Sequence, residues 1–109
     1  MNLLKLREKV NKGIDLGAEV VYIKENNKLF GIDSIEKIED SKNIIFIKSE
    51  GNSLICKDFI NIIEKIYKQL GDINACIGEK SNFINGYKSI DVVEFAQYEN
   101  IKMLFLNAY

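Results

Sequence analysis

The sequence predicts an α+β domain in which two helices lie on a mostly antiparallel meander sheet of six or seven strands. Length and composition support one domain, because 109 residues with 47% hydrophobic side chains suffice for a single core. Segments with helical apolar spacing alternate with segments typical of strands. The order helix, strand, strand, strand occurs twice, which predicts an internal duplication with pseudo-repeats at residues 1–56 and 57–109.

The duplication is most visible in one nine-residue segment. Residues 31–39, GIDSIEKIE, recur as residues 86–94, GYKSIDVVE, with Gly, Ser, Ile and the final Glu in matching positions. A period of about 55 residues is typical of two copies of one supersecondary unit, each too small to bury its own apolar face. We therefore expect the two halves to pack as one body with pseudo-twofold symmetry.

The first predicted element is an amphipathic helix over residues 3–12. Its apolar residues lie three or four positions apart and share one face: Leu3, Leu6 and Val10. The helix is expected to end near Gly13. A short loop then leads to a strand over residues 18–24, because its Val-Val-Tyr-Ile run is rich in β-branched and aromatic residues.

The segment 29–39 is less regular, because its isoleucines lie three residues apart whereas a strand repeats every two. A strand with a bulge is the predicted structure, and a short helix is the alternative. Residues 43–48 follow as a strand that is apolar on both faces, which is typical of a strand covered on both sides. A hairpin turn at residues 50–52 is expected to lead into a short strand, 53–56.

The second half begins with a helix over residues 58–70. Its apolar stripe is strong, Asp58 or Lys57 is the expected N-cap, and Gly71 is expected to end it. A strand over residues 73–77 follows.

The remaining segments are strands that mirror the first half. Residues 86–97 correspond to residues 31–40, and a last strand over 101–106 is again apolar on both faces. No proline and no Ser/Gly tract separates the halves, so a single domain is expected. The alternative architecture is a more open sheet whose apolar face is closed by a second chain.

Composition and charge disfavour several classes of function. The net charge is −1, and Arg7 is the single arginine, so no arginine cluster is present for phosphate recognition. No apolar run approaches the ~20 residues of a membrane span, and the first residues do not read as a signal peptide. Cys56 and Cys76 are expected to be reduced, buried thiols in a cytoplasmic protein, with a disulfide between them as the alternative.

No catalytic, metal or cofactor site is predicted. The chain has no histidine, and therefore lacks an imidazole base and any Ser-His or Cys-His pair. Two pairs of acids, Glu36/Glu39 and Asp91/Glu94, are interpreted as solvated surface groups, and a carboxylate-dependent hydrolase at Asp91/Glu94 is the enzymatic alternative. No C-x-x-C motif, calcium loop or glycine-rich phosphate loop occurs.

Protein binding is the remaining class with positive support. Aromatic and aliphatic residues accompany polar turns in two corresponding loops, where they could anchor a partner. These candidate protein-binding residues are Leu29, Phe30, Phe83, Ile84 and Tyr87. The alternative is that they begin the next strand and point inward. A further alternative is nucleic-acid binding through the lysines of the first helix, Lys5, Lys9 and Lys12.

The pattern Leu3-x-x-Leu6-x-x-x-Val10, followed by GAEVVY at 17–22, IDSI at 32–35 and IIFI at 44–47, resembles short phage and prophage proteins. Those proteins begin with a helix and continue with a D-A-E-V-type strand and two further strands. The likeness covers about the first 48 residues, with a degenerate version over residues 59–106, and the chain departs from the type by having two copies. The resemblance implies a phage or mobile-element protein, and such proteins are often inhibitors of host defence, including anti-CRISPR proteins.

Taken together, these patterns predict a non-enzymatic inhibitor that acts in the cytoplasm of a bacterial host cell. Its expected partner is a defence nuclease complex, which it blocks by steric occlusion, alone or as a homodimer. No membrane partner is expected. The alternatives are an immunity protein that neutralises a bacterial toxin, and a small module that binds nucleic acid or a nucleotide.

Overall fold

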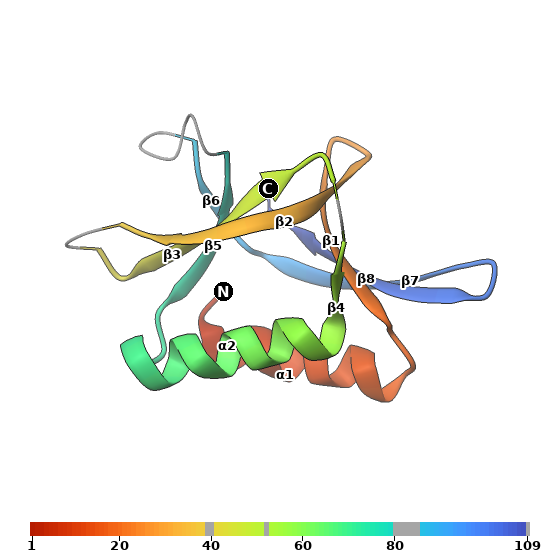
Figure 1. Ribbon diagram of the computed structural model, residues 1–109, viewed down its shortest axis with the longest axis horizontal. Helices are drawn as coiled ribbons and strands as arrows, with labels where there is room; N and C mark the ends of the chain where they lie inside the picture. Colours follow the sequence, from red (N-terminus) through yellow and green to blue (C-terminus); the bar gives the residue numbers. More distant parts are fainter. Residues whose placement is uncertain (39–40, 52, 80–85, 109) are drawn as a thin grey trace.

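The computed structural model describes residues 1–38, 41–51, 53–79 and 86–108. Within these residues the chain forms two helices and one mixed sheet of eight strands, which curls like a half-barrel over the helices (Figure 1). The elements are α1 (Leu3–Asp15), β1 (Val20–Glu25), β2 (Lys28–Lys37), β3 (Asn43–Ser49), β4 (Leu54–Ile55), α2 (Cys56–Leu70), β5 (Asn74–Gly78), β6 (Lys88–Ser89), β7 (Val92–Tyr98) and β8 (Ile101–Asn107). The predicted α+β class is confirmed.

The sheet has the strand order β6-β5-β3-β2-β1-β8-β7, and β4 also pairs with β1. Most neighbours are antiparallel, but β1 is parallel to β8 and β3 is parallel to β5. The predicted plain meander is therefore wrong. Parallel neighbours need a crossover, and α2 supplies it between β3 and β5. Each parallel pair joins a strand of residues 1–56 to a strand of residues 57–109, so one sheet spans both halves.

Helix α1 packs on the concave face of the sheet through Leu3, Leu6 and Val10. It continues to Asp15, past the predicted end at Gly13. A Cβ atom at Gly13 would lie 2.5 Å from Cδ2 of Leu104, so glycine is what allows the helix to lie this close to β8. Glycine at position 13 keeps helical geometry, and the helix ends only at its C-cap residue, Leu16.

Helix α2 begins at Cys56, and neither Asp58 nor Lys57 is its N-cap. The N-cap is Ile55, because β4 holds this residue extended against β1 up to the first helical turn. The predicted hairpin with residues 43–48 is also wrong, since β3 already has β2 on one edge and β5 on the other. The predicted end is confirmed, with Gly71 following at φ 80°. In the described part of the chain, neither α1 nor α2 has the length and apolar character that crossing a membrane would require.

The bulge predicted in the segment 29–39 is confirmed. Strand β2 runs to Lys37 and its register against β3 shifts between Ile32 and Ser34. The corresponding segment 86–97 is instead divided into β6 and β7. Between them, the amide of Ile90 donates to the carbonyl of Ala75 on β5, and the amide of Asp91 donates to the carbonyl of Asn107 on β8. The chain therefore leaves β5 and joins β8 within two residues.

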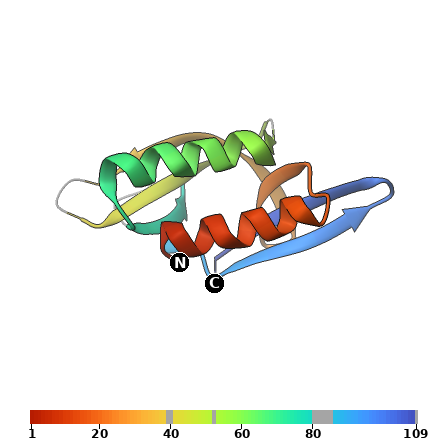
Figure 2. The same ribbon diagram turned by 90° about the horizontal axis from the view of Figure 1, so that it is seen from below.

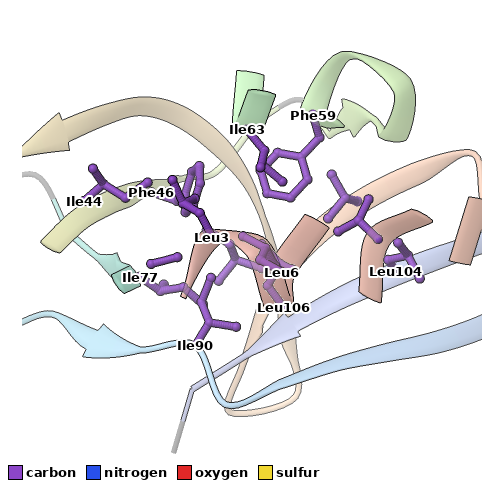
Figure 3. Packing of buried hydrophobic residues seen from close by; sticks show 14 of the residues in the cluster. Leu3, Leu6, Ile44, Phe46, Phe59, Ile63, Ile77, Ile90, Leu104 and Leu106 are labelled. Atoms are coloured by element: carbon purple, nitrogen blue, oxygen red, sulfur yellow. The ribbon is translucent and has the colours of Figure 1, made fainter. Parts of the chain in front are cut away.

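The main core lies between the two helices and the concave face of the sheet (Figure 3). Near its middle, Phe46 of β3 and Phe59 of α2 meet edge to face, with ring centroids 5.2 Å apart. A second cluster on the opposite face of the sheet contains Ile45, Ile47 and Cys76. Strand β3 is therefore buried on both faces, as its apolar sequence predicts.

Cys56 and Cys76 are free and buried, so the disulfide alternative is wrong. Burial raises the pKa of the Cys56 thiol to about 11, and burial likewise raises the pKa of Cys76. Because the thiolate is the reactive form, we expect both thiols to resist a thiol reagent in the folded protein at about pH 8 and to react once guanidinium unfolds it. Reaction of either thiol before unfolding would contradict this expectation.

The same burial makes stability depend on pH. Each folded thiol has a pKa above the unfolded value of about 8.5, so the folded chain retains protons that the unfolded chain releases. The stabilisation is complete below about pH 8.5 and is lost as pH rises toward about 11, the pKa of folded Cys56. Guanidinium midpoints measured at about pH 8 and about pH 10 should show the decrease.

Candidate protein-binding site on the outer face of the sheet

The structure separates the residues that the sequence singled out for protein binding. Leu29 lies on β2 with 41% of its surface exposed. Phe30 is half-buried, packs against the main core and lies beneath the ammonium groups of Lys28 and Lys48. Tyr87 is half-buried against the second cluster of Ile45, Ile47 and Cys76. Phe83 and Ile84 lie outside the described residues, so among the others Leu29 alone is on the open surface.

An apolar depression lies on the outer face of the sheet, over strands β2, β1 and β8 and the end of β7. We call it the sheet groove; its volume is about 510 Å³. Its apolar lining consists of Tyr22, Leu29, Tyr98, Ile101, Met103 and Phe105. Lys24, Asn27 and Glu99 also line it. Figure 2 shows that both helices lie on the other face of the sheet.

Strand alternation explains why these side chains lie together. On β1, Val21 and Ile23 are buried in the core, so Tyr22 between them points to the opposite face. On β8, Leu104 and Leu106 are buried in the same core, so Met103 and Phe105 point outward. The parallel register sets Tyr22 beside Phe105, with ring centroids 6.5 Å apart. The groove is the apolar outer face of two strands whose inner face is core.

One end of the sheet groove is charged. The Lys24 ammonium lies 3.6 Å from Oε1 of Glu94 and 5.2 Å from the centroid of the Phe105 ring. Glu94 also accepts a hydrogen bond of 3.4 Å from the side-chain amide of Asn107. Beyond Lys24, a polar depression of about 360 Å³ continues past Asn27 toward Lys88. The site is therefore apolar along most of its length, with an ion pair at one end.

A second ion cluster, centred on Lys48, joins strands of the sheet. The side chain of Lys48 on β3 is 7% exposed, and its ammonium lies 2.9 Å from Glu25 and 3.2 Å from Glu79. Burial by itself lowers the pKa of Lys48, but the two carboxylates outweigh it, so the pKa is raised above its ordinary value. This lysine therefore stays charged at neutral pH and ties the end of β1 to the residue that follows β5.

One of the carboxylates considered for catalysis, Glu94, already has polar partners in the structure. Glu94 is engaged by Lys24 and Asn107, and Glu39 lies outside the described residues. In the parts of the chain that the structure describes, no group of three or more histidine, cysteine or acidic residues is arranged to hold a metal ion.

The basic face of α1 is partly compensated by acids. Lys12 lies 3.6 Å from Glu8 one turn away, and Arg7 lies 3.2 Å from Glu64 on α2. Arg7 also lies over the ring of Tyr67, which joins the two helices.

Comparisons with models of protein families, with curated proteins and with solved structures found no match. The fold and the site therefore define the class by themselves: an α+β protein with a curled mixed sheet and an uncovered apolar groove on its outer face. Sequence reasoning missed five groove residues: Tyr22, Tyr98, Ile101, Met103 and Phe105. Apolar residues at every second position from 101 to 105 were the available signal, but the same pattern also fits a strand covered on both faces.

Proposed function

We propose that this protein is a non-enzymatic protein-binding inhibitor that docks on its target through the sheet groove. The observation that carries the proposal is an apolar groove left open on the sheet face opposite the helices, with Tyr98 74% exposed and Ile101 49% exposed. Apolar patches of this kind are typical of interaction sites, and aromatic side chains are frequent anchors in them.

The proposed occupant is an apolar surface segment of a protein, rather than nucleic acid. Binding to nucleic acid relies on cations that meet phosphates. Lys24 is the basic residue in the lining of the sheet groove, and Glu94 already neutralises it. An apolar floor with one ion pair at its end is suited to an apolar ridge flanked by polar groups.

For the target we propose a bacterial defence nuclease complex, inhibited by occlusion of one of its surfaces inside the host cell. The support for this target class is the resemblance of residues 1–48 to short phage and prophage proteins. Support for occlusion rather than catalysis comes from the lack of histidine and from the engagement of Glu94.

A cleavage titration tests this function. The purified protein is added in increasing amounts to a panel of CRISPR effector complexes, and cleavage of target DNA is measured. Occlusion predicts that inhibition of one complex is complete near one protein molecule per binding site. Inhibition by far smaller amounts that grows with time would indicate turnover and would contradict occlusion. Inhibition of a toxin, with no effect on any nuclease, would favour an immunity protein instead.

We also propose that the two halves descend from a duplicated α-β-β-β unit. The pairing pattern supports this: the first strand of each half is parallel to a later strand of the other, β1 with β8 and β5 with β3, whereas the short β4 of the first half pairs with β1. In both halves the second segment is antiparallel to the first and then to the third, although β6 and β7 share this role in the second half.

A further inference from the structure

Strand β7 ends the sheet on one side, and its sequence lacks the usual protection of an edge. Among the described strands it pairs with β8 alone, and Figure 2 shows the β7–β8 hairpin extending beyond the helices with β7 at its outer margin. Edge strands usually carry lysine, proline or a bulge that discourages further pairing. Residues 92–98, VVEFAQY, contain no lysine and no proline, and their register with β8 has no shift.

The hairpin turn shows which groups face the open side of β7. Tyr98 and Ile101 flank a two-residue turn, and in such a hairpin the flanking residues form a hydrogen-bonded pair. Hydrogen-bonded and non-hydrogen-bonded pairs alternate along an antiparallel ladder. The main-chain groups of Val93, Phe95 and Gln97 therefore point away from β8. Among the described residues, no main-chain hydrogen bond between elements reaches them.

Apolar exposure is concentrated on the same hairpin. Of the eight large hydrophobic side chains exposed in the described residues, four belong to it: Val92, Phe95, Tyr98 and Ile101. An open ladder edge flanked by exposed apolar side chains is the surface onto which another strand adds.

We propose that a second copy of this chain pairs with this edge, β7 against β7 in antiparallel orientation. The strand is complementary to itself in the register that pairs Phe95 with its own copy. That register also pairs Val93 with Gln97. All three residues whose main-chain groups face the open edge are then paired, which gives about six main-chain hydrogen bonds. The strand's one charged residue, Glu94, then lies opposite Ala96 and away from the second Glu94.

Other registers are less favourable. In the register that pairs Glu94 with Glu94 of the second copy, two carboxylates lie opposite each other, which is destabilising. In the register that pairs Ala96 with its own copy, Val93 has no partner within the strand. The twofold axis of the Phe95 register is perpendicular to the sheet, so the two sheet grooves lie on the same side of the dimer. The dimer does not depend on the proposed inhibitor function, because none of the three edge-facing residues, Val93, Phe95 and Gln97, lines the sheet groove.

Sedimentation or light scattering of the full chain tests the dimer. The mass of the wild-type protein should reach about twice the chain mass of 12.5 kDa as its concentration is raised to about 1 mM. The variants Phe95→Lys and Phe95→Glu should each be monomeric, because two like charges would then lie opposite each other at position 95 of the two copies. Their equimolar mixture should restore the dimer, because opposite charges then meet at position 95. A monomeric wild-type protein, or a dimer that persists in either single variant, would overturn the proposal.

A second pair of variants tests the same edge without changing Phe95, in case the Phe95 variants do not fold. Gln97→Pro removes an amide that faces the open edge, and proline is tolerated on edge strands at such positions. We expect this variant to be monomeric with circular dichroism like that of the wild type, whereas Gln97→Ala should remain dimeric. A dimeric Gln97→Pro protein would contradict the proposed edge.

Discussion

Replacing Phe59 with alanine should lower the free energy of unfolding by about 3–5 kcal/mol. Phe59 is fully buried and meets Phe46 edge to face, so its removal leaves a cavity between α2 and the sheet. A domain of this size has about 5–15 kcal/mol of stability, so the loss is a large share of the total. Guanidinium denaturation followed by circular dichroism measures the change.

Leu70→Ala is the matched control for this prediction. Leu70 lies on the same helix but is 38% exposed at its end, so its removal should change stability by about 0.5 kcal/mol or less. Equal losses in the two variants would show that α2 does not pack on the sheet through Phe59.

The double variant Leu29→Glu/Ile101→Lys should weaken target binding by about 100-fold, which corresponds to about 2.7 kcal/mol. Both side chains line the sheet groove and both are partly exposed, at 41% and 49%, so they can be replaced without opening the core. The carboxylate introduced at position 29 would face Lys24, the cross-strand neighbour of that position. The two changes together keep the net charge of −1, so a loss of binding would not reflect overall charge.

Leu70→Lys is the control for the groove variant, because it adds a charge to an exposed apolar position at the far end of α2 (Figure 1). It should retain full affinity. Thermal unfolding of both variants should stay close to that of the wild-type protein, since changes at exposed positions are usually within about 0.5 kcal/mol. Equal binding by all three proteins would exclude the groove as the contact surface.

Local pattern predicted the elements well and their pairing poorly. Helix α1 and the end of α2 could be predicted because their signals are local. These signals are the helical spacing of Leu3, Leu6 and Val10 and the glycine at position 71. Strand pairing depends on which edges remain open after folding. Leu54–Ile55 pairs with β1 because β3 has no free edge, and nothing within residues 53–56 carries that information.

The candidate site shows the same limit. Leu29 was identified because it lies beside a polar turn, but Phe30 and Tyr87 look similar in sequence and pack inward. Strands β3 and β8 both read as apolar on two faces, yet Ile45 and Ile47 are buried whereas Met103 and Phe105 line an open groove. Whether an outer face is covered depends on other segments of the fold, which the strand's own sequence does not report.

Parallel capture with three tagged baits tests the groove most directly. The wild-type protein, the Leu29→Glu/Ile101→Lys variant and the Leu70→Lys control are exposed to the same lysate of a bacterium that carries defence nucleases, at moderate salt. Retained proteins are quantified by mass spectrometry. We predict that the wild type and the control retain one nuclease complex in stoichiometric amounts and that the groove variant does not. Retention of that complex by all three baits, or of nucleic acid alone by the wild type, would contradict protein binding through the sheet groove.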